Sequence, residues 1–132
     1  MTPLVAVMLF VIGITWWMLD PIRGMQHSWP GAPGGELRFR LRYRSPAALL
    51  WLGRKGNCGL AVFGVVHIRE RQVSAPLLAH ELAHLCRMRS GQWSYLARYL
   101  FVPSFRRAEE VACWEFAEEH RQDPVLIGLA EA

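Results

Sequence analysis

The pentapeptide His80-Glu81-Leu82-Ala83-His84 constrains this chain more than any other stretch of its sequence. On an α-helix, residues four apart lie on one face, so His80 and His84 can present two imidazole nitrogens to a single metal ion. Glu81 lies about 100° around the helix from His80, which places its carboxylate beside such an ion. There it can take a proton from a water molecule on the metal. The pattern therefore predicts a helix that carries two metal ligands and one general base.

The residues around this pentapeptide are typical of a helix. Ser74 can cap its N-terminus, and Pro76 suits the first turn. Gly91 is a natural end. An apolar back lies opposite the histidine face, formed by Leu78, Leu82 and Leu85. The alternative is a helix with two ordinary histidines and a solvated glutamate.

Two histidines do not hold a catalytic zinc ion, because such a site needs three protein ligands and an open position for water. We expect the third ligand on a predicted helix over residues 105–117, where Glu109 and Glu110 compete. Within about 60° of Glu109 lies a small apolar face that can pack closely against the first helix: Ala112, Cys113 and Phe116. Glu110 lies about 100° from this face. We therefore prefer Glu109; the alternative is that both acids are solvated.

HExxH is the signature of zincin metallopeptidases, and Glu109-x-x-Ala112 downstream of it resembles the gluzincins. In that group, Glu-x-x-Ala followed by Asp or Asn supplies the third ligand. Residues 65–120 are also similar to small bacterial and phage HExxH proteins of uncharacterised function. The resemblance implies Zn²⁺ held by His80, His84 and Glu109, with Glu81 as the general base of peptide hydrolysis.

The chain departs from the gluzincin pattern at Cys113, where the larger families have Asp or Asn. In those families, that residue is implied to hydrogen-bond a histidine ligand. A thiol is a poor substitute for this support. Cys113 lies on the metal-facing side of its helix, but we prefer the glutamate as the ligand.

The composition of the chain limits its number of domains, its partners and its redox compartment. The chain has 132 residues, which suits one domain with a modest core. Its net charge of +4 suits a protein beside an anionic membrane leaflet. Aromatic and basic residues are not interleaved as in proteins that stack bases, so we expect no nucleic acid. Three cysteines with no CxxC pair argue against a disulfide scaffold and fit a reducing compartment.

The N-terminus is a run of apolar residues from Leu4 to Leu19. As a helix it would span about 24 Å, less than the ~30 Å hydrocarbon core of a bilayer. Trp16 and Trp17 resemble an interfacial aromatic belt, and the arginines lie downstream. We predict a transmembrane or signal-anchor helix over residues 1–20, with a single-pass topology and the following domain in the cytoplasm. A cleaved signal peptide and a helix buried against the domain are the alternatives.

Glycine and proline divide the rest of the chain. Residues 21–35 form a predicted linker, because four Gly and three Pro in residues 20–35 defeat regular structure. A short helix is expected from Pro46 to about Leu52, ended by Gly53, with a turn over residues 54–57. A last short helix starts at Asp123-Pro124.

Two segments are predicted strands. Residues 36–44 alternate apolar side chains with arginines, as a half-buried strand does when its polar face meets water. Residues 60–69 are rich in Val and Ile and predict a second, central strand. In zincins, an edge strand beside the metal helix pairs with an extended peptide, and this second strand is the expected candidate. Gly64 would allow close backbone approach there.

Several aromatic and histidine side chains have two interpretations. The segment Gln92–Val102 has helical spacing and is expected to roof the site, with Tyr95 and Tyr99 one turn apart. Either tyrosine could stabilise an oxyanion, or both are core aromatics. His67 lies in the second strand and is expected to be packed or exposed rather than catalytic. His120 shares a face with Glu109 but lies about 16 Å along the helix, too far to share its zinc.

Together these patterns predict an α+β fold, a minimal zincin-like domain over residues 36–132 with a small sheet packed on the HExxH and third-ligand helices. The leading hypothesis is a zinc metalloendopeptidase acting on a peptide or protein substrate. One alternative is a non-catalytic, membrane-anchored zinc-binding or interaction module. Another is a basic membrane adaptor without metal.

Overall fold

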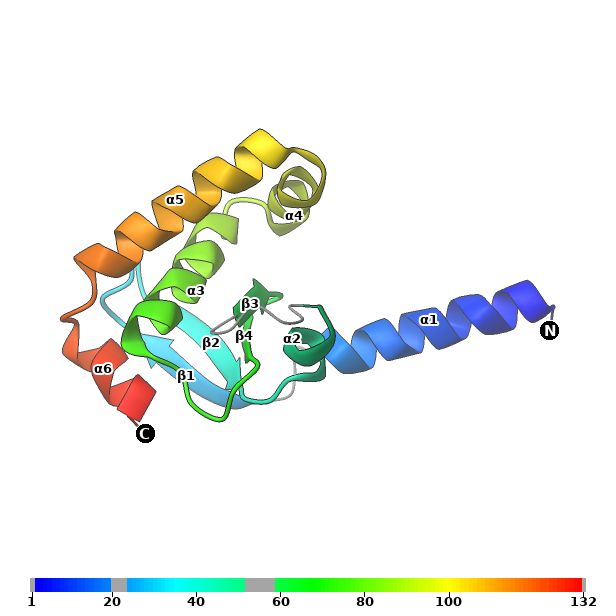
Figure 1. Ribbon diagram of the computed structural model, residues 1–132, viewed down its shortest axis with the longest axis horizontal. Helices are drawn as coiled ribbons and strands as arrows, with labels where there is room; N and C mark the ends of the chain where they lie inside the picture. The colour runs from blue at the N-terminus through cyan, green and yellow to red at the C-terminus, as the bar shows by residue number, and fades with distance from the viewer. Residues whose placement is uncertain (1, 20–23, 52–58, 132) are drawn as a thin grey trace.

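The computed structural model describes residues 2–19, 24–51 and 59–131. These residues form an α+β fold with one small sheet and several helices, which confirms the predicted class (Figure 1). In chain order, the elements are α1 (Pro3–Leu19), β1 (Met25–Trp29), β2 (Leu37–Arg42), α2 (Pro46–Trp51), β3 (Gly59–Val62), β4 (Val65–Ile68), α3 (Ala75–Met88), α4 (Gln92–Phe101), α5 (Pro103–Glu119) and α6 (Pro124–Glu131).

The four strands of the described sheet lie in the order β1-β2-β4-β3. β2 and β4 are parallel, whereas β1 pairs with β2, and β3 with β4, in antiparallel fashion. The main core joins one face of this sheet to α3 and includes Val66 and Ile68 of β4. Val65 and His67 alternate with them and therefore point to the opposite face, beside α2. The sheet thus separates two buried regions.

β2 follows the alternation that its sequence predicts. Leu37, Phe39 and Leu41 are buried, and the arginines between them are half-buried or exposed. The arginine face does not simply meet water. The Arg40 guanidinium donates to the carbonyl of Gly24 (3.2 Å), and Arg42 donates to the carbonyl of Trp17 (3.3 Å). These bonds tie β2 to the segments that precede it.

The prediction of a linker over residues 21–35 is wrong for β1. Met25 pairs with Leu41, and the register continues to Trp29 opposite Leu37. Trp29 is fully buried, and its indole Nε1 donates to Asp123 at 3.1 Å. Most of the glycines and prolines lie just after the strand, so they end it rather than prevent it. Residues 20–23 lie outside the described residues.

The predicted single strand over residues 60–69 is instead a hairpin of β3 and β4. Phe63 and Gly64 form its two-residue turn between the paired Val62 and Val65. Both turn residues have positive φ, 52° and 74°, as a type I′ turn requires. Gln92 secures the turn, because its side chain accepts a 2.7 Å hydrogen bond from the Phe63 amide. Gly64 therefore serves the turn, and β4 rather than the whole segment is central.

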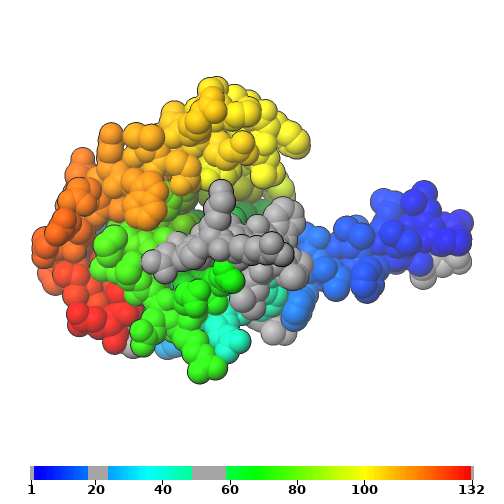
Figure 2. Space-filling view, in the orientation of Figure 1, coloured from blue at the N-terminus to red at the C-terminus, as the bar shows by residue number. Residues whose placement is uncertain are grey.

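α1 projects from the rest of the molecule, and its described side chains from Leu4 to Trp17 are exposed (Figures 1 and 2). The alternative of a helix buried against the domain is wrong for these residues. Within residues 2–19, 24–51 and 59–131, no helix has both the length and the apolar character needed to cross a membrane.

α2, α4 and α6 begin where the sequence predicts, whereas α5 begins at Pro103, two residues before its predicted start. Pro46 opens α2; its expected end at Leu52 and Gly53 and the turn at 54–57 lie outside the described residues. α4 connects α3 to α5, and α5 packs against α3. Asp123 Oδ1 accepts from the Val125 amide (2.9 Å) at the start of α6. This arrangement puts α3, α4, α5 and β3 around one cavity.

Candidate metal centre

α3 forms for the reasons that its sequence predicts. Ser74 Oγ accepts a 3.3 Å hydrogen bond from the Leu77 amide, which satisfies one of the free donors of the first turn. Leu78 and Leu82 are fully buried in the main core. This anchoring turns the opposite face, with His80 and His84, toward the cavity.

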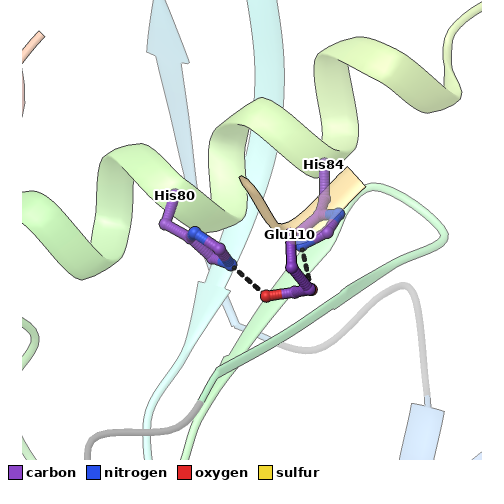
Figure 3. A group of neighbouring side chains, drawn as sticks. All are labelled: His80, His84 and Glu110. Carbon is purple, nitrogen blue, oxygen red and sulfur yellow. Dashed lines mark ion pairs between the residues drawn. The ribbon is translucent and has the colours of Figure 1, made fainter. Parts of the chain in front are cut away.

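Three side chains that could bind a metal ion converge at this face of α3. Glu110 Oε2 lies 3.1 Å from His80 Nε2, and Glu110 Oε1 lies 3.0 Å from His84 Nε2 (Figure 3). One ligand atom from each residue lies within 4.8 Å of the other two. Among the described residues, this set is the group of His, Cys, Asp and Glu side chains that could hold a metal ion.

The structure brings Glu110, and not Glu109, to the histidines, contrary to the preference from sequence. Glu109 is buried against Arg87, whose Nη2 donates to Oε1 at 2.8 Å and whose Nε donates to Oε2. The small face of α5 does pack against α3, as Cys113 and Ala117 are buried. A face in such close contact leaves no room for an ion. The acid that meets the histidines is therefore Glu110, at the margin of the contact, where the cavity lies.

The cavity has a volume of about 290 Å³ and is mainly apolar. Its polar side chains are the three converging residues, Glu81, and the tyrosines Tyr95 and Tyr99. His80 packs on Trp114 with 4.1 Å between ring centroids. The apolar lining comes from Leu60, Ala61, Leu77, Met88, Leu96 and Trp114. A few polar groups in an apolar hollow are typical of a ligand site.

Glu81 is buried at the cavity, beside Gly59 at the start of β3. A Cβ at Gly59 would lie 2.8 Å from Glu81 Cγ, so only glycine fits without displacing the carboxylate. Burial, and then the negative charge of Glu110, raise the pKa of Glu81 to about 8. The sequence reading missed Gly59; its one signal was a glycine at the start of an apolar strand.

The Glu110 carboxyl is ionised although it is half-buried. Burial alone raises the pKa of its carboxyl, but hydrogen bonds from His80, His84 and Tyr99 outweigh burial and hold the pKa well below its ordinary value. The Tyr99 hydroxyl donates to Glu110 Oε1. A carboxylate that is charged and oriented by three hydrogen-bond donors suits a cation site.

The two tyrosines of α4 contact two of the candidate metal ligands. The Tyr95 hydroxyl lies 2.7 Å from His84 Nδ1, and Tyr99 reaches Glu110. Their rings are stacked, with centroids 6.1 Å apart. The expectation that this helix roofs the site is met. The sequence pattern did not indicate that each hydroxyl contacts one of these side chains.

Cys113 lies 3.5 Å from the same His84 Nδ1, at the position where the gluzincin pattern has Asp or Asn. Burial, and then the charge of Glu110, raise the pKa of its thiol to about 12. The sulfur is thus a neutral neighbour of His84. Cys86 is also a free thiol, and Cys58 lies outside the described residues. His80 Nδ1 differs from His84 Nδ1, since it is buried without a hydrogen-bond partner among the described residues.

The other histidines lie elsewhere. His67 is buried on the far face of the sheet, with Nδ1 2.6 Å from Ser45 Oγ. Its pKa is lowered to about 4 by burial and by the Arg42 charge. His120 stacks on Phe116 (4.1 Å) and meets the edge of Trp29 (5.3 Å), away from the cavity as expected.

No protein-family model, curated protein or solved structure matches this chain.

Proposed function

We propose that this protein is a zinc-dependent peptidase in which His80, His84 and Glu110 hold the metal and Glu81 is the general base. One observation carries the proposal: two imidazole Nε2 atoms and a charged carboxylate converge at a cavity that a second, buried carboxylate also lines.

The donor set fits zinc. Two imidazoles and one glutamate are the ligands of a common type of catalytic zinc site, which keeps a fourth position open. Structural sites use four ligands and usually include cysteine thiolates. Here three donors face a cavity, and Cys113 is a neutral thiol behind His84. These features favour an enzyme over the rival, a non-catalytic zinc-binding or interaction module.

Zinc in this position would polarise the carbonyl of a peptide and acidify a water molecule. The Glu81 carboxylate then accepts one proton from the attacking water, while the water oxygen bonds to the carbonyl carbon. Glu81 next delivers that proton to the nitrogen of the leaving amine as the carbon–nitrogen bond breaks. Gly59 keeps the Glu81 side chain in place by leaving room for it.

β3 is the best candidate for binding an extended peptide. It is an edge strand of the described sheet, and Gly59, Leu60 and Ala61 line the cavity. β4, which directly precedes α3, is paired on both sides and cannot take another strand. A peptide paired with β3 would use main-chain hydrogen bonds for affinity and the apolar lining for side-chain selection.

Association with a membrane stays a prediction. Its support is α1, which exposes a continuous apolar surface, including Phe10 (68%) and Trp16 (60%). Flotation of the full chain with vesicles containing anionic lipid would test it. Replacement of Phe10 and Trp16 by Ser should reduce the bound fraction, and equal flotation of this variant would remove the support.

Two measurements test the peptidase proposal. The purified wild type should contain about one zinc ion per chain, and Glu110→Ala should contain none. Wild type should cleave members of an unbiased peptide library, whereas Glu81→Gln should retain zinc and lose cleavage by at least about 100-fold. A zinc-free wild type contradicts the metal site. Stoichiometric zinc without cleavage of any peptide favours the non-catalytic module.

A further inference from the structure

Several arginines lie at one end of the sheet, far from the histidine ligands in the sequence. β2 and β4 are parallel neighbours, so their C-terminal ends lie at the same end of the sheet. Arg44 follows β2, whereas Arg69 and Arg71 follow β4. These three residues and Glu70 line one open pocket of about 420 Å³. Three guanidinium groups against one carboxylate leave this pocket, the arginine pocket, positively charged.

Backbone contacts hold Arg44 at the arginine pocket. Its φ is +48°, a left-handed conformation that is uncommon for a residue other than glycine. The Arg44 amide donates to the carbonyl of Glu70 at 3.2 Å, and the amide of Ser45 donates to the carbonyl of Ile68 at 3.1 Å. These two bonds join the turn after β2 to the loop after β4. Arg44 is thereby placed beside the arginines of that loop.

The charge of the arginine pocket is open to a partner from outside the chain. Arg44 and Arg71 are exposed, and within the part of the chain that the structure describes neither forms an ion pair with an acid. Glu70, the acid of the pocket, is exposed as well. A guanidinium presents paired N–H donors that match the oxygens of a phosphate group. The arginine pocket therefore suits a phosphate-bearing anion.

α1 leaves the domain at the same end of the sheet. The guanidinium of Arg42, two residues before Arg44, donates to the carbonyl of Trp17 at 3.3 Å, near the end of α1. α1 has no polar face and projects away from the domain (Figure 1). Trp16 and Trp17 are exposed near its C-terminal end, as aromatic residues at the headgroup level of a bilayer are. With α1 inserted in a bilayer, the arginine pocket lies next to the headgroups.

We propose that the arginine pocket of Arg44, Arg69 and Arg71 binds the phosphate groups of anionic lipids when α1 enters a bilayer. This inference rests on the membrane association predicted for α1 and not on the metal site. The exposed apolar helix at the same end of the molecule favours a lipid over a soluble anion. Two kinds of contact then hold the domain at the leaflet: apolar contacts along α1 and ionic contacts at its base.

Flotation of the full chain tests the proposal, with vesicles of phosphatidylcholine alone and with added phosphatidylserine. Wild type should bind the vesicles with phosphatidylserine more tightly. The double variant Arg44→Gln, Arg71→Gln should lose about 25-fold of that binding, because each arginine near an anionic surface contributes about fivefold. Its binding to phosphatidylcholine alone should be unchanged. Salt at about 1 M should remove most of the preference, because the Debye length falls to about 3 Å.

The matched control is the double variant Arg107→Gln, Arg121→Gln, which removes the same charge from exposed positions on or just after α5, away from α1 (Figure 1). It should keep most of the binding. Glu70→Gln should instead tighten binding to phosphatidylserine vesicles by about fivefold, because the pocket loses its carboxylate. Arg44→Lys with Arg71→Lys should keep the preference, since both charges remain. Unfolding midpoints close to wild type would show that weaker binding is not a loss of fold.

Equal binding of wild type to both kinds of vesicle would overturn the proposal and keep the membrane association of α1. An equal loss in the α5 control would also overturn it, because net charge alone would then explain the preference. Release of the bound protein by inorganic phosphate at constant ionic strength would assign the pocket to a soluble anion instead. A wild type that floats with neither vesicle would remove both the lipid pocket and the membrane association. The zinc content of the same preparation decides the metal site separately.

Discussion

Buried histidines lie on both sides of the sheet, but the groups that surround them differ in charge. On the α3 side, His80 and His84 are 3% and 6% exposed and contact the Glu110 carboxylate at the wall of a cavity. On the α2 side, His67 is 0% exposed and meets a serine hydroxyl and the charge of Arg42. Burial alone therefore does not make a histidine a metal ligand.

The difference lies in what the partners stabilise. A carboxylate beside imidazole favours a positive charge, whether a proton or a metal ion. A neighbouring cation and a closed apolar environment disfavour both. Burial, and then the Arg42 charge, lower the pKa of His67 to about 4. No acid among the described residues joins His67 in a potential metal group. What distinguishes the α3 side is that several potential metal-binding side chains meet at one cavity.

The largest expected effect separates the two faces by their metal affinity. His80→Ala should weaken zinc binding by more than about 100-fold, because loss of a ligand exceeds the 10–100-fold cost of losing an outer-shell partner. His67→Gln should bind zinc as tightly as wild type. Zinc content after dialysis and chelator competition measure both. Equal losses in the two variants would break the distinction drawn between the faces.

A smaller effect is expected from the glycine that makes room on the α3 side. Gly59→Ala should retain zinc but lower peptide cleavage by up to about 100-fold, because its Cβ would push the Glu81 carboxylate away. Gly64→Ala is the control: its Cβ meets nothing within 4 Å, but its φ is +74°. It should cost about 1 kcal/mol in the free energy of unfolding and spare the cleavage rate. Unchanged cleavage in Gly59→Ala would remove the steric argument.

The smallest effect concerns acid stability on the α2 side. The pKa of His67 is lowered in the folded state, so unfolding takes up a proton and stability falls as the pH falls from about 6.5 toward 4. We expect this residue to account for about 2 kcal/mol over that window. Denaturant unfolding of the metal-free protein at several pH values, for wild type and His67→Gln, measures the difference. A variant with the same pH dependence as wild type would contradict the assignment.

Local patterns proved reliable where one element decides the outcome. Ser74, Pro76 and the buried leucines define α3 regardless of the rest of the chain, because capping and amphipathic spacing act within a few turns. The alternation in β2 is similar, since a period of two buries Phe39 and Leu41 once any core covers one face. Patterns that depend on a partner strand were less reliable. β1 was missed because its pairing with β2 outweighs its weak local preference for a strand.

The sequence by itself therefore determined the helix that carries His80, Glu81 and His84, together with the downstream helix that holds the paired acids. Only the tertiary structure decided between Glu109 and Glu110. Their positions on α5 differ by about 100°, and the depth of the α3–α5 contact places one acid against Arg87 and the other at the cavity. Helix periodicity describes which side chains share a face. It carries no information on how far apart two packed faces lie, and a metal site needs that distance.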